Sequence, residues 1–154
     1  MRIELETDIE ARMRKALRSA GQSEIGGMLF AEELAFSHFR VVDFSVDFLS
    51  GSHTSFRRDS HAHEQSLNAF FDRTGREFSR FNYFGEWHSH PSFSVNISPQ
   101  DIATMTELVS TEGSNISFAV LLVVRLRFFG VDYSWTVFSR DHPPQSPKKT
   151  IRWI

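Results

Sequence analysis

The sequence predicts an α+β fold, a mixed β-sheet flanked by helices. Segments with hydrophobic residues at helical spacing are interspersed with short apolar or alternating segments rich in valine and phenylalanine, which is typical of strands. With 154 residues, of which 40% are hydrophobic and 16 are phenylalanine, the chain is long enough for one core and too apolar for a disordered segment. We therefore expect a single mixed-sheet domain.

Residues 7–20 are the first expected helix. Thr7 and Glu10 fit a capping box, and Gly21 follows the last periodic residue. The expected buried positions recur every four residues, at Ile9, Met13 and Leu17.

The next segments are predicted as strands over 24–31 and 35–46, a short strand over 54–58 and a helix over 60–78. Gly75 weakens the end of this helix. Its apolar face consists of Leu67, Phe70, Phe71 and Phe78.

A strand over 81–88 leads into a polar segment, and a helix over 98–109 follows with Ser98 as its N-cap and proline next. The apolar stripe of this helix is Ile102, Met105, Leu108 and Val109. Residues 115–140 are predicted to form a hairpin of two strands. The last segment, 141–154, contains three prolines and is expected to be a C-terminal tail or a docking segment.

Composition limits the classes of function. The net charge of −2 gives no reason to expect nucleic acid as a partner, and the absence of cysteine excludes disulfides, thiolate metal sites and a cysteine nucleophile. The N-terminus lacks the apolar region of a signal peptide, and the apolar run at 118–124 is far shorter than the roughly 20 residues that cross a bilayer. We therefore expect a cytoplasmic protein with no membrane partner.

The polar segment "GEWHSHPSFSVNISPQD" at 85–101 predicts a metal site. Side chains two residues apart on a strand share a face, so His88 and His90 can turn toward one ion. The helix that begins near Ser98 can bring Asp101 back to them. Two imidazoles and one carboxylate suit Zn²⁺ with a fourth position open, which is typical of catalytic zinc. Ser98 and Asp101 also fit a capping box, so the aspartate has two possible roles.

A second His-x-His sequence, "HAHE" at 61–64, provides a contrast. It lies in a predicted helix, where residues two apart project about 200° from each other. Thr74 stands eleven positions after His63, where a matching aspartate would be required. His61 and His63 are therefore expected to be solvent-exposed helix residues.

The sequence "HSHP", six residues and then "SPQD", on a strand that leads into a helix, resembles the JAMM zinc metalloproteases, also called MPN-plus or JAB domains. The family also has a glutamate before a Gly-Gly-apolar strand, and "SEIGGMLF" supplies Glu24. The resemblance covers residues 1–140 and implies a cytidine-deaminase-like architecture. Ala31 stands where the family often has glycine, and Gly26 and Gly27 fit either a bulge or close approach of a substrate.

The resemblance implies a role for each of five residues. His88, His90 and Asp101 would ligate one zinc ion per chain. Glu24 would take a proton from the attacking water and pass it to the leaving amine. Ser98 would donate a hydrogen bond to the oxyanion, its backbone capping the helix while its hydroxyl faces the metal.

The resemblance also implies a substrate class. Compact bacterial members are associated with ubiquitin-like pathways that contain E1-like and E2-like proteins, some of them in antiphage defence. A peptidase or isopeptidase that cuts after the C-terminus of a ubiquitin-like protein is therefore expected. Two alternatives stay open: a zinc peptidase for another tail, such as a sulfur-carrier precursor or a cell-wall or phage-tail peptide, and a metal-free scaffold, which the five site residues oppose. The short loop at 92–97 leaves linkage selectivity open.

Overall fold

The computed structural model describes residues 1–48 and 60–152, with side chains for 1–47 and 63–148. The predicted strand at 54–58 lies outside these residues. The elements in chain order are β1 (Arg2–Leu5), α1 (Thr7–Ala20), β2 (Ile25–Ala35), β3 (His38–Phe44), β4 (Asp47–Phe48), α2 (Ser60–Arg73), β5 (Phe81–Ser89), α3 (Pro99–Ser110), β6 (Phe118–Leu126), β7 (Val131–Ser139), β8 (His142–Gln145) and β9 (Lys149–Arg152).

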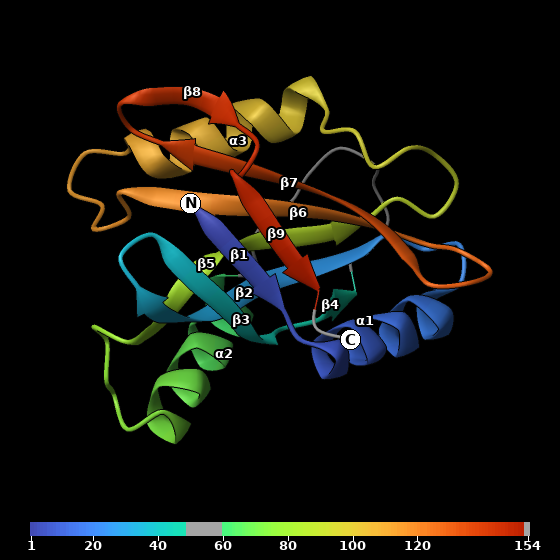
Figure 1. The fold of residues 1–154 in the computed structure, drawn as a ribbon, viewed down its shortest axis with the longest axis horizontal. Coiled ribbons are helices and arrows are strands. Elements are labelled where there is room, and N and C mark those ends of the chain that lie inside the picture. Colours follow the sequence, from blue (N-terminus) through green and yellow to red (C-terminus); the bar gives the residue numbers. More distant parts are fainter. Residues whose placement is uncertain (49–59, 153–154) are drawn as a thin grey trace.

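The described strands form one mixed sheet in the order β8-β7-β6-β5-β2-β3-β1-β9, with β4 paired to β2. The β5–β6, β1–β3 and β1–β9 pairs are parallel and the others antiparallel. The largest core packs α1 against one face, and two smaller cores pack α3 and α2 against the other (Figure 1). The predicted α+β fold is confirmed. Within the described part of the chain, no helix has the length and apolar composition needed to cross a membrane.

Helix α1 has the predicted bounds, and Ile9, Met13 and Leu17 are buried. The predicted capping box is wrong. The N-cap is Glu6, with extended backbone and no side-chain hydrogen bond to the helix. Because β1 ends at Leu5 and leads almost directly into the helix, Thr7 already lies inside the first turn.

Helix α2 ends at Arg73, five residues earlier than predicted, because Gly75 and Arg76 both have positive φ. Phe70 is buried and stacks on Phe30 with ring centroids 4.5 Å apart, whereas Phe78 lies beyond the helix and is 49% exposed. Glycine therefore ends the helix here rather than weakening it.

Helix α3 begins as predicted, with Ser98 as N-cap and proline in the first turn. Met105, Leu108 and Val109 are buried, but Ile102 is 37% exposed and lies at the margin of the stripe.

The ends of the chain contribute strands that the sequence pattern did not predict. Strand β1 has only four residues, with Ile3 and Leu5 buried, and pairs with both β3 and β9. Residues 141–154 contain β8, which pairs with β7, and β9. Trp153 and Ile154 lie outside the described residues.

A β-bulge in β5 decides which side chains face α3. Leu29 pairs with Gly85 and Phe30 with Tyr83, so Phe84 has no partner in β2. As a result Phe84 and Trp87, three residues apart, both enter the core beside α1, and Glu86, His88 and His90 take the opposite face. Gly85 has φ of 153°, and a Cβ there would lie 1.9 Å from the Val120 carbonyl oxygen.

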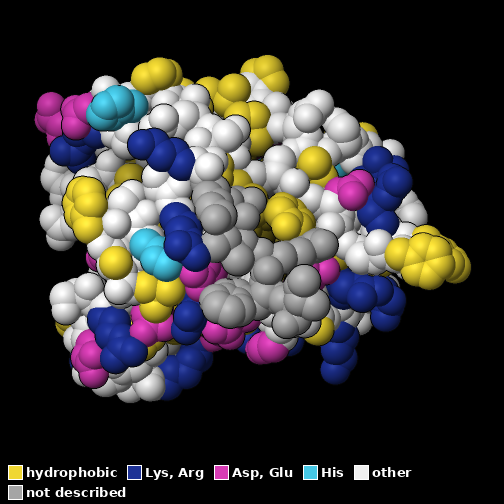
Figure 2. Space-filling view, viewed as in Figure 1, with side chains coloured by type: hydrophobic (Ala, Val, Ile, Leu, Met, Phe, Trp, Pro, Cys, Tyr) yellow, Lys and Arg dark blue, Asp and Glu magenta, His cyan; other side chains and the backbone are white. Residues whose placement is uncertain are grey.

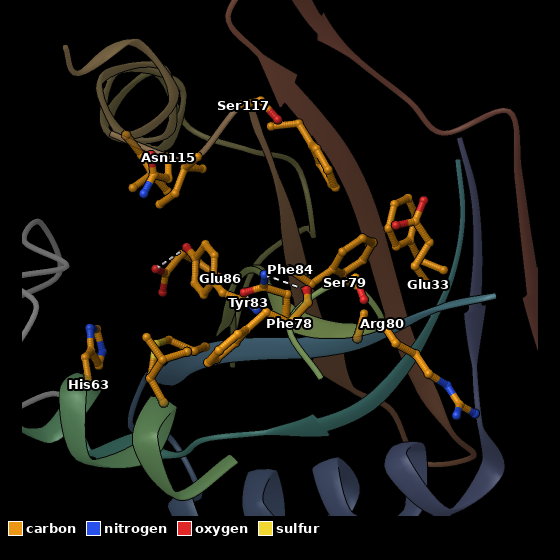
Figure 3. Close-up of a pocket in the computed structure, with 18 residues that line it drawn as sticks. Glu33, His63, Phe78, Ser79, Arg80, Tyr83, Phe84, Glu86, Asn115 and Ser117 are labelled. Carbon is orange, nitrogen blue, oxygen red and sulfur yellow. Dashed lines mark hydrogen bonds between the residues drawn. The ribbon is translucent and has the colours of Figure 1, made fainter. Parts of the chain in front are cut away.

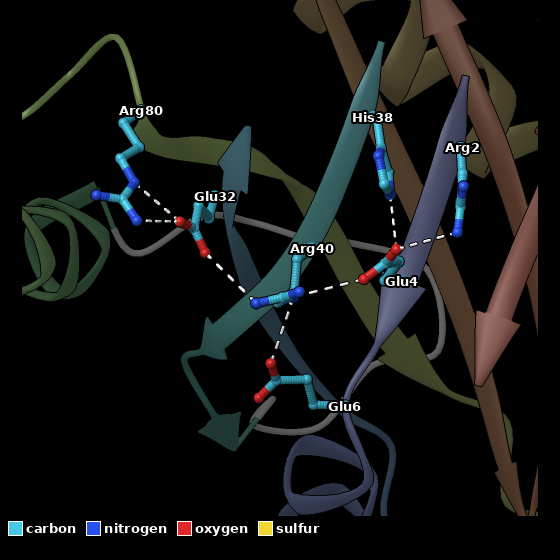
Figure 4. A network of polar contacts seen from close by, with 7 residues as sticks. All are labelled: Arg2, Glu4, Glu6, Glu32, His38, Arg40 and Arg80. Carbon is cyan, nitrogen blue, oxygen red and sulfur yellow. Dashed lines mark hydrogen bonds and ion pairs between the residues drawn. The ribbon is translucent and has the colours of Figure 1, made fainter. Parts of the chain in front are cut away.

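A network of charged side chains joins β1, β2 and β3 (Figure 4). The buried Glu4 carboxylate contacts Arg2, His38 and Arg40. Glu32 contacts Arg40 and accepts hydrogen bonds from Arg80. Because Glu32 pairs with Phe81 at the start of β5, this network lies at the opposite end of β5 from the histidines.

Candidate metal centre

Three side chains predicted as metal ligands converge where β5 ends and α3 begins. The Nε2 atoms of His88 and His90 are 3.1 Å apart, and His88 Nε2 lies 3.7 Å from Asp101 Oδ1. One ligand atom from each of the three residues lies within 4.8 Å of the other two. Two imidazole nitrogens and one carboxylate oxygen at this spacing can surround a single small cation.

His90 is 6% exposed and is held by the loop that follows it. Its Nδ1 lies 2.6 Å from the carbonyl oxygen of Ser94. Because a carbonyl oxygen only accepts, the Nδ1–H donates this bond, and the Nε2 lone pair faces His88 and Asp101. Phe93 packs on the His90 ring at 4.3 Å between centroids and remains 48% exposed. A histidine oriented through its second nitrogen is typical of metal ligands.

Burial lowers the pKa of His88 below its ordinary value of 6.5. Asp101 acts in the opposite direction, His90 lowers the pKa further, and Glu24 raises it. The dominant effect of burial favours neutral imidazole, the form that binds metal.

The two carboxylate oxygens of Asp101 have different partners. Oδ2 accepts hydrogen bonds from the Ser98 backbone N–H at 2.7 Å and from the Ser98 hydroxyl at 2.8 Å. Oδ1 faces His88. The capping role and the ligand role, which the sequence left as alternatives, are therefore compatible because each uses a different oxygen.

The expectation for the Ser98 hydroxyl needs correction. It accepts a hydrogen bond from the Asp101 backbone N–H at 3.1 Å and donates to Asp101 Oδ2, so the hydroxyl itself forms the cap. To donate to an oxyanion, the O–H must rotate away from Asp101 Oδ2 while its oxygen keeps the capping bond.

Glu24 directly precedes β2, which is paired with β5. Gly26 lies opposite His88, so two residues further along the same ladder Glu24 comes level with His90. A buried hydrogen bond from the Ile25 N–H to Ser89 Oγ, 3.0 Å long, fixes this end of the pair. The effect of Glu24 on the pKa of His88 agrees with this placement.

Packing within the protein leaves no room for a side chain at Gly27. A Cβ at this position would lie 2.3 Å from the backbone oxygen of Ser45. That same oxygen accepts a hydrogen bond from the Trp87 indole at 2.8 Å. Close approach here is between two segments of the protein rather than between protein and substrate.

The prediction for His63 is wrong. His63 lies in α2 as expected, but its side chain is only 12% exposed and its Nε2 lies 2.9 Å from Asp47 Oδ2. Asp47 pairs with Gly26, which in turn pairs with His88, so this second polar pair lies on the same side of the sheet as the metal centre. The side chain of His61 lies outside the described residues.

Sequence reasoning also missed a cavity of about 500 Å³ beside the N-terminal half of β5 (Figure 3). No ligand of the candidate metal centre lines it. Glu86 does, two residues before His88, and it is 3% exposed with Oε1 accepting a 2.7 Å hydrogen bond from Tyr83. The position of Glu86 in the sequence could have indicated it, because Glu86 follows Gly85 and lies two residues before His88, on the same strand face.

A family model described as prokaryotic homologs of the JAB domain matches residues 6–139. The chain belongs to this JAB family. The resemblance predicted from the histidine and aspartate spacing is therefore confirmed. No curated protein matches the chain.

Solved structures with this fold include a protein from Desulfitobacterium hafniense, with a TM-score of 0.70, 17% identity and coverage of 98% of this chain and 92% of that one. A JAB1/MPN domain protein from Archaeoglobus fulgidus has a TM-score of 0.52, 14% identity and 97% coverage of both chains. A protein from Salinibacter ruber has a TM-score of 0.56, 16% identity and coverage of 96% and 90%. At these identities the likeness establishes the JAB/MPN fold alone.

Proposed function

We propose that this JAB domain is a zinc-dependent peptidase or isopeptidase. It cleaves the amide bond after the C-terminus of a ubiquitin-like protein, either in a precursor or in a conjugate. The observation that carries the proposal is the convergence of His88 Nε2, His90 Nε2 and Asp101 Oδ1, with Glu24 directly before the neighbouring strand β2.

The donor set fits zinc. Neutral imidazole and carboxylate are its ordinary ligands in a chain without cysteine, and three protein ligands leave a fourth position open. The Ser94 carbonyl orients His90, and the Ser98 backbone and hydroxyl orient Asp101. Zinc held there would act as a Lewis acid and lower the pKa of a water molecule.

The remaining site residues supply proton transfer and charge stabilisation. Glu24 is proposed as the general base that takes the proton of the attacking water and as the acid that delivers it to the leaving amine. Ser98 is proposed to donate a hydrogen bond from its hydroxyl to the oxyanion, a contribution typically worth on the order of 3 kcal/mol.

The substrate class rests on the family rather than on the site. The proposed setting is a cytoplasmic bacterial ubiquitin-like pathway of antiphage defence, with E1-like and E2-like proteins as its other components. The short loop between His90 and Ser98 offers little surface for gripping a second protein, so any selectivity between targets must come from another part of the molecule.

The deciding experiment uses the ubiquitin-like protein encoded by a neighbouring gene, fused to a reporter and incubated with the zinc-loaded chain. Intact mass should show one cut after the ubiquitin-like C-terminus. Elemental analysis of protein purified without chelator should give about one zinc per chain. A folded, active protein that is free of metal would refute the proposal.

The alternative of a zinc peptidase for a different tail would be supported by zinc binding without cleavage of this fusion. The alternative of a metal-free scaffold would be supported by absence of zinc. The spacing of the His88, His90 and Asp101 ligand atoms favours an enzyme over the scaffold.

A further inference from the structure

The tip of the β6–β7 hairpin carries two phenylalanine rings on the outside of the molecule. Phe128 and Phe129 are 89% and 91% exposed and pack edge to face with centroids 4.7 Å apart. Among the large hydrophobic side chains of the described residues, only Phe36 is comparably exposed, at 97%. Hairpin tips are ordinarily polar, and a contiguous exposed apolar pair often marks an interaction surface.

This tip lies at the same end of the sheet as the candidate metal centre. Strands β5 and β6 are parallel, Ser89 pairs with Val124, and the His90 N–H donates to the Val124 carbonyl at 2.8 Å. Strand β6 continues for two more residues before the turn, so the tip lies roughly 10 Å beyond the level of His90. In Figure 1 the hairpin projects at the right, beside the loop between α1 and β2 that contains Glu24.

Two arginines, Arg125 and Arg127, lie between the level of His90 and the two rings along the hairpin. Val123 is buried against α3, so Arg125, two residues later, shares the sheet face of His90. Arg125 is half-buried, and no side chain in the described ranges forms a hydrogen bond or ion pair with its guanidinium. Arg127 is half-exposed and lies 3.4 Å from Asp132. Figure 2 shows hydrophobic side chains protruding at this edge, with Lys and Arg side chains beside them.

We propose that residues 125–129 of this hairpin form a docking surface for the folded body of the protein substrate. The complementary patch on that substrate would be apolar, to cover the two rings, and bordered by carboxylates, to pair with the guanidinium of Arg125. This inference rests on the proposed function. A protein fits better than a membrane because Arg125 lies on the same sheet face as His90, on the neighbouring strand. A polypeptide with its C-terminal tail near His90 would bring its body against the tip.

The test compares two substrates: the fusion of the ubiquitin-like protein with a reporter, and its C-terminal tail alone joined to the same reporter. The test variant is Phe128→Ser with Phe129→Ser, and Arg125→Gln is a second variant. Phe36→Ser is the matched control, because Phe36 is equally exposed but lies in the β2–β3 turn, at the opposite end of β2 from Glu24.

The double variant should lower the ratio of kcat/KM for the fusion to kcat/KM for the tail at least about tenfold, through KM. Arg125→Gln should lower the ratio in the same direction, and Phe36→Ser should leave it unchanged. An unchanged ratio in the double variant would overturn the inference. The inference would also be overturned if the wild type bound vesicles of anionic phospholipid, the double variant did not, and the ratio was the same for both.

Failure of the proposed function would look different, because the wild type would then cleave neither substrate. The docking surface would in that case be judged by calorimetric titration of the chain as purified with the ubiquitin-like protein. Binding that the double variant loses would uphold it. Binding that both share, or absence of binding by the wild type, would overturn it.

Discussion

Asp101 has two roles, as a predicted metal ligand and as part of the capping box of α3. The roles can be separated experimentally because each carboxylate oxygen has a different partner. Asp101→Asn leaves one acceptor oxygen in place of two. If that oxygen keeps the bonds from the Ser98 backbone and hydroxyl, an NH₂ group faces the histidines. If the oxygen faces the histidines instead, the Ser98 N–H and hydroxyl lose their acceptor, while the hydroxyl still accepts from the backbone N–H of residue 101. Either orientation removes the anionic ligand, so the variant should lose tight zinc binding.

Ser98→Ala is the matched control. It removes the hydroxyl that caps α3, and loss of an N-cap costs about 1 kcal/mol, or about 2–4 °C in Tm for a chain of this size. It leaves Asp101 Oδ1 and both histidines in place. Thermal unfolding in chelator should show this loss for Ser98→Ala and no larger loss for Asp101→Asn, whose oxygen can keep the bonds from Ser98. Only Asp101→Asn should lose zinc by elemental analysis. Zinc retained in Asp101→Asn, or lost in Ser98→Ala, would refute this division of roles.

Three further predictions concern other parts of the chain. Glu24→Gln should keep about one zinc per chain and lose cleavage of the fusion, because Glu24 is not a ligand; joint loss of metal and activity would show that it is one. Gly85→Ala should destabilise the protein by more than about 3 kcal/mol in denaturant unfolding, because its Cβ would overlap the Val120 carbonyl. Gly113→Ala, which meets open space at φ of 77°, should cost only about 1 kcal/mol; equal losses would contradict the steric argument. Finally, His88 should bind fewer protons in the folded metal-free chain than in the unfolded chain just below pH 6.5, because burial lowers its pKa. The His88 contribution should lower the denaturation midpoint as pH drops through that value and should be complete below the folded pKa, whereas a rise in the midpoint would contradict the direction of the shift.

Local sequence features predicted much of the fold. Periodic apolar residues define α1 within its observed bounds, and a serine N-cap with proline in the first turn defines the start of α3. These signals depend on neighbours a few residues away, which act before any tertiary contact forms. Strand β1 has no such signal, because its four residues become a strand only through pairing with β3 and β9.

The candidate ligands were also predictable, since two histidines on one strand and an aspartate in the next helix are separated by a short loop. The sequence alone determined which residue types were available, their spacing and hence the JAB family. Tertiary structure decided the rest. The β-bulge next to Gly85 determines which face of the sheet His88 and His90 occupy. Pairing of β2 with β5 brings Glu24 level with them from more than sixty residues away in the sequence. The partner of each Asp101 oxygen, the burial of His63 against Asp47 and the exposure of the Phe128–Phe129 tip likewise depend on which segments meet in space, because burial and hydrogen bonding are set by neighbours distant in the chain.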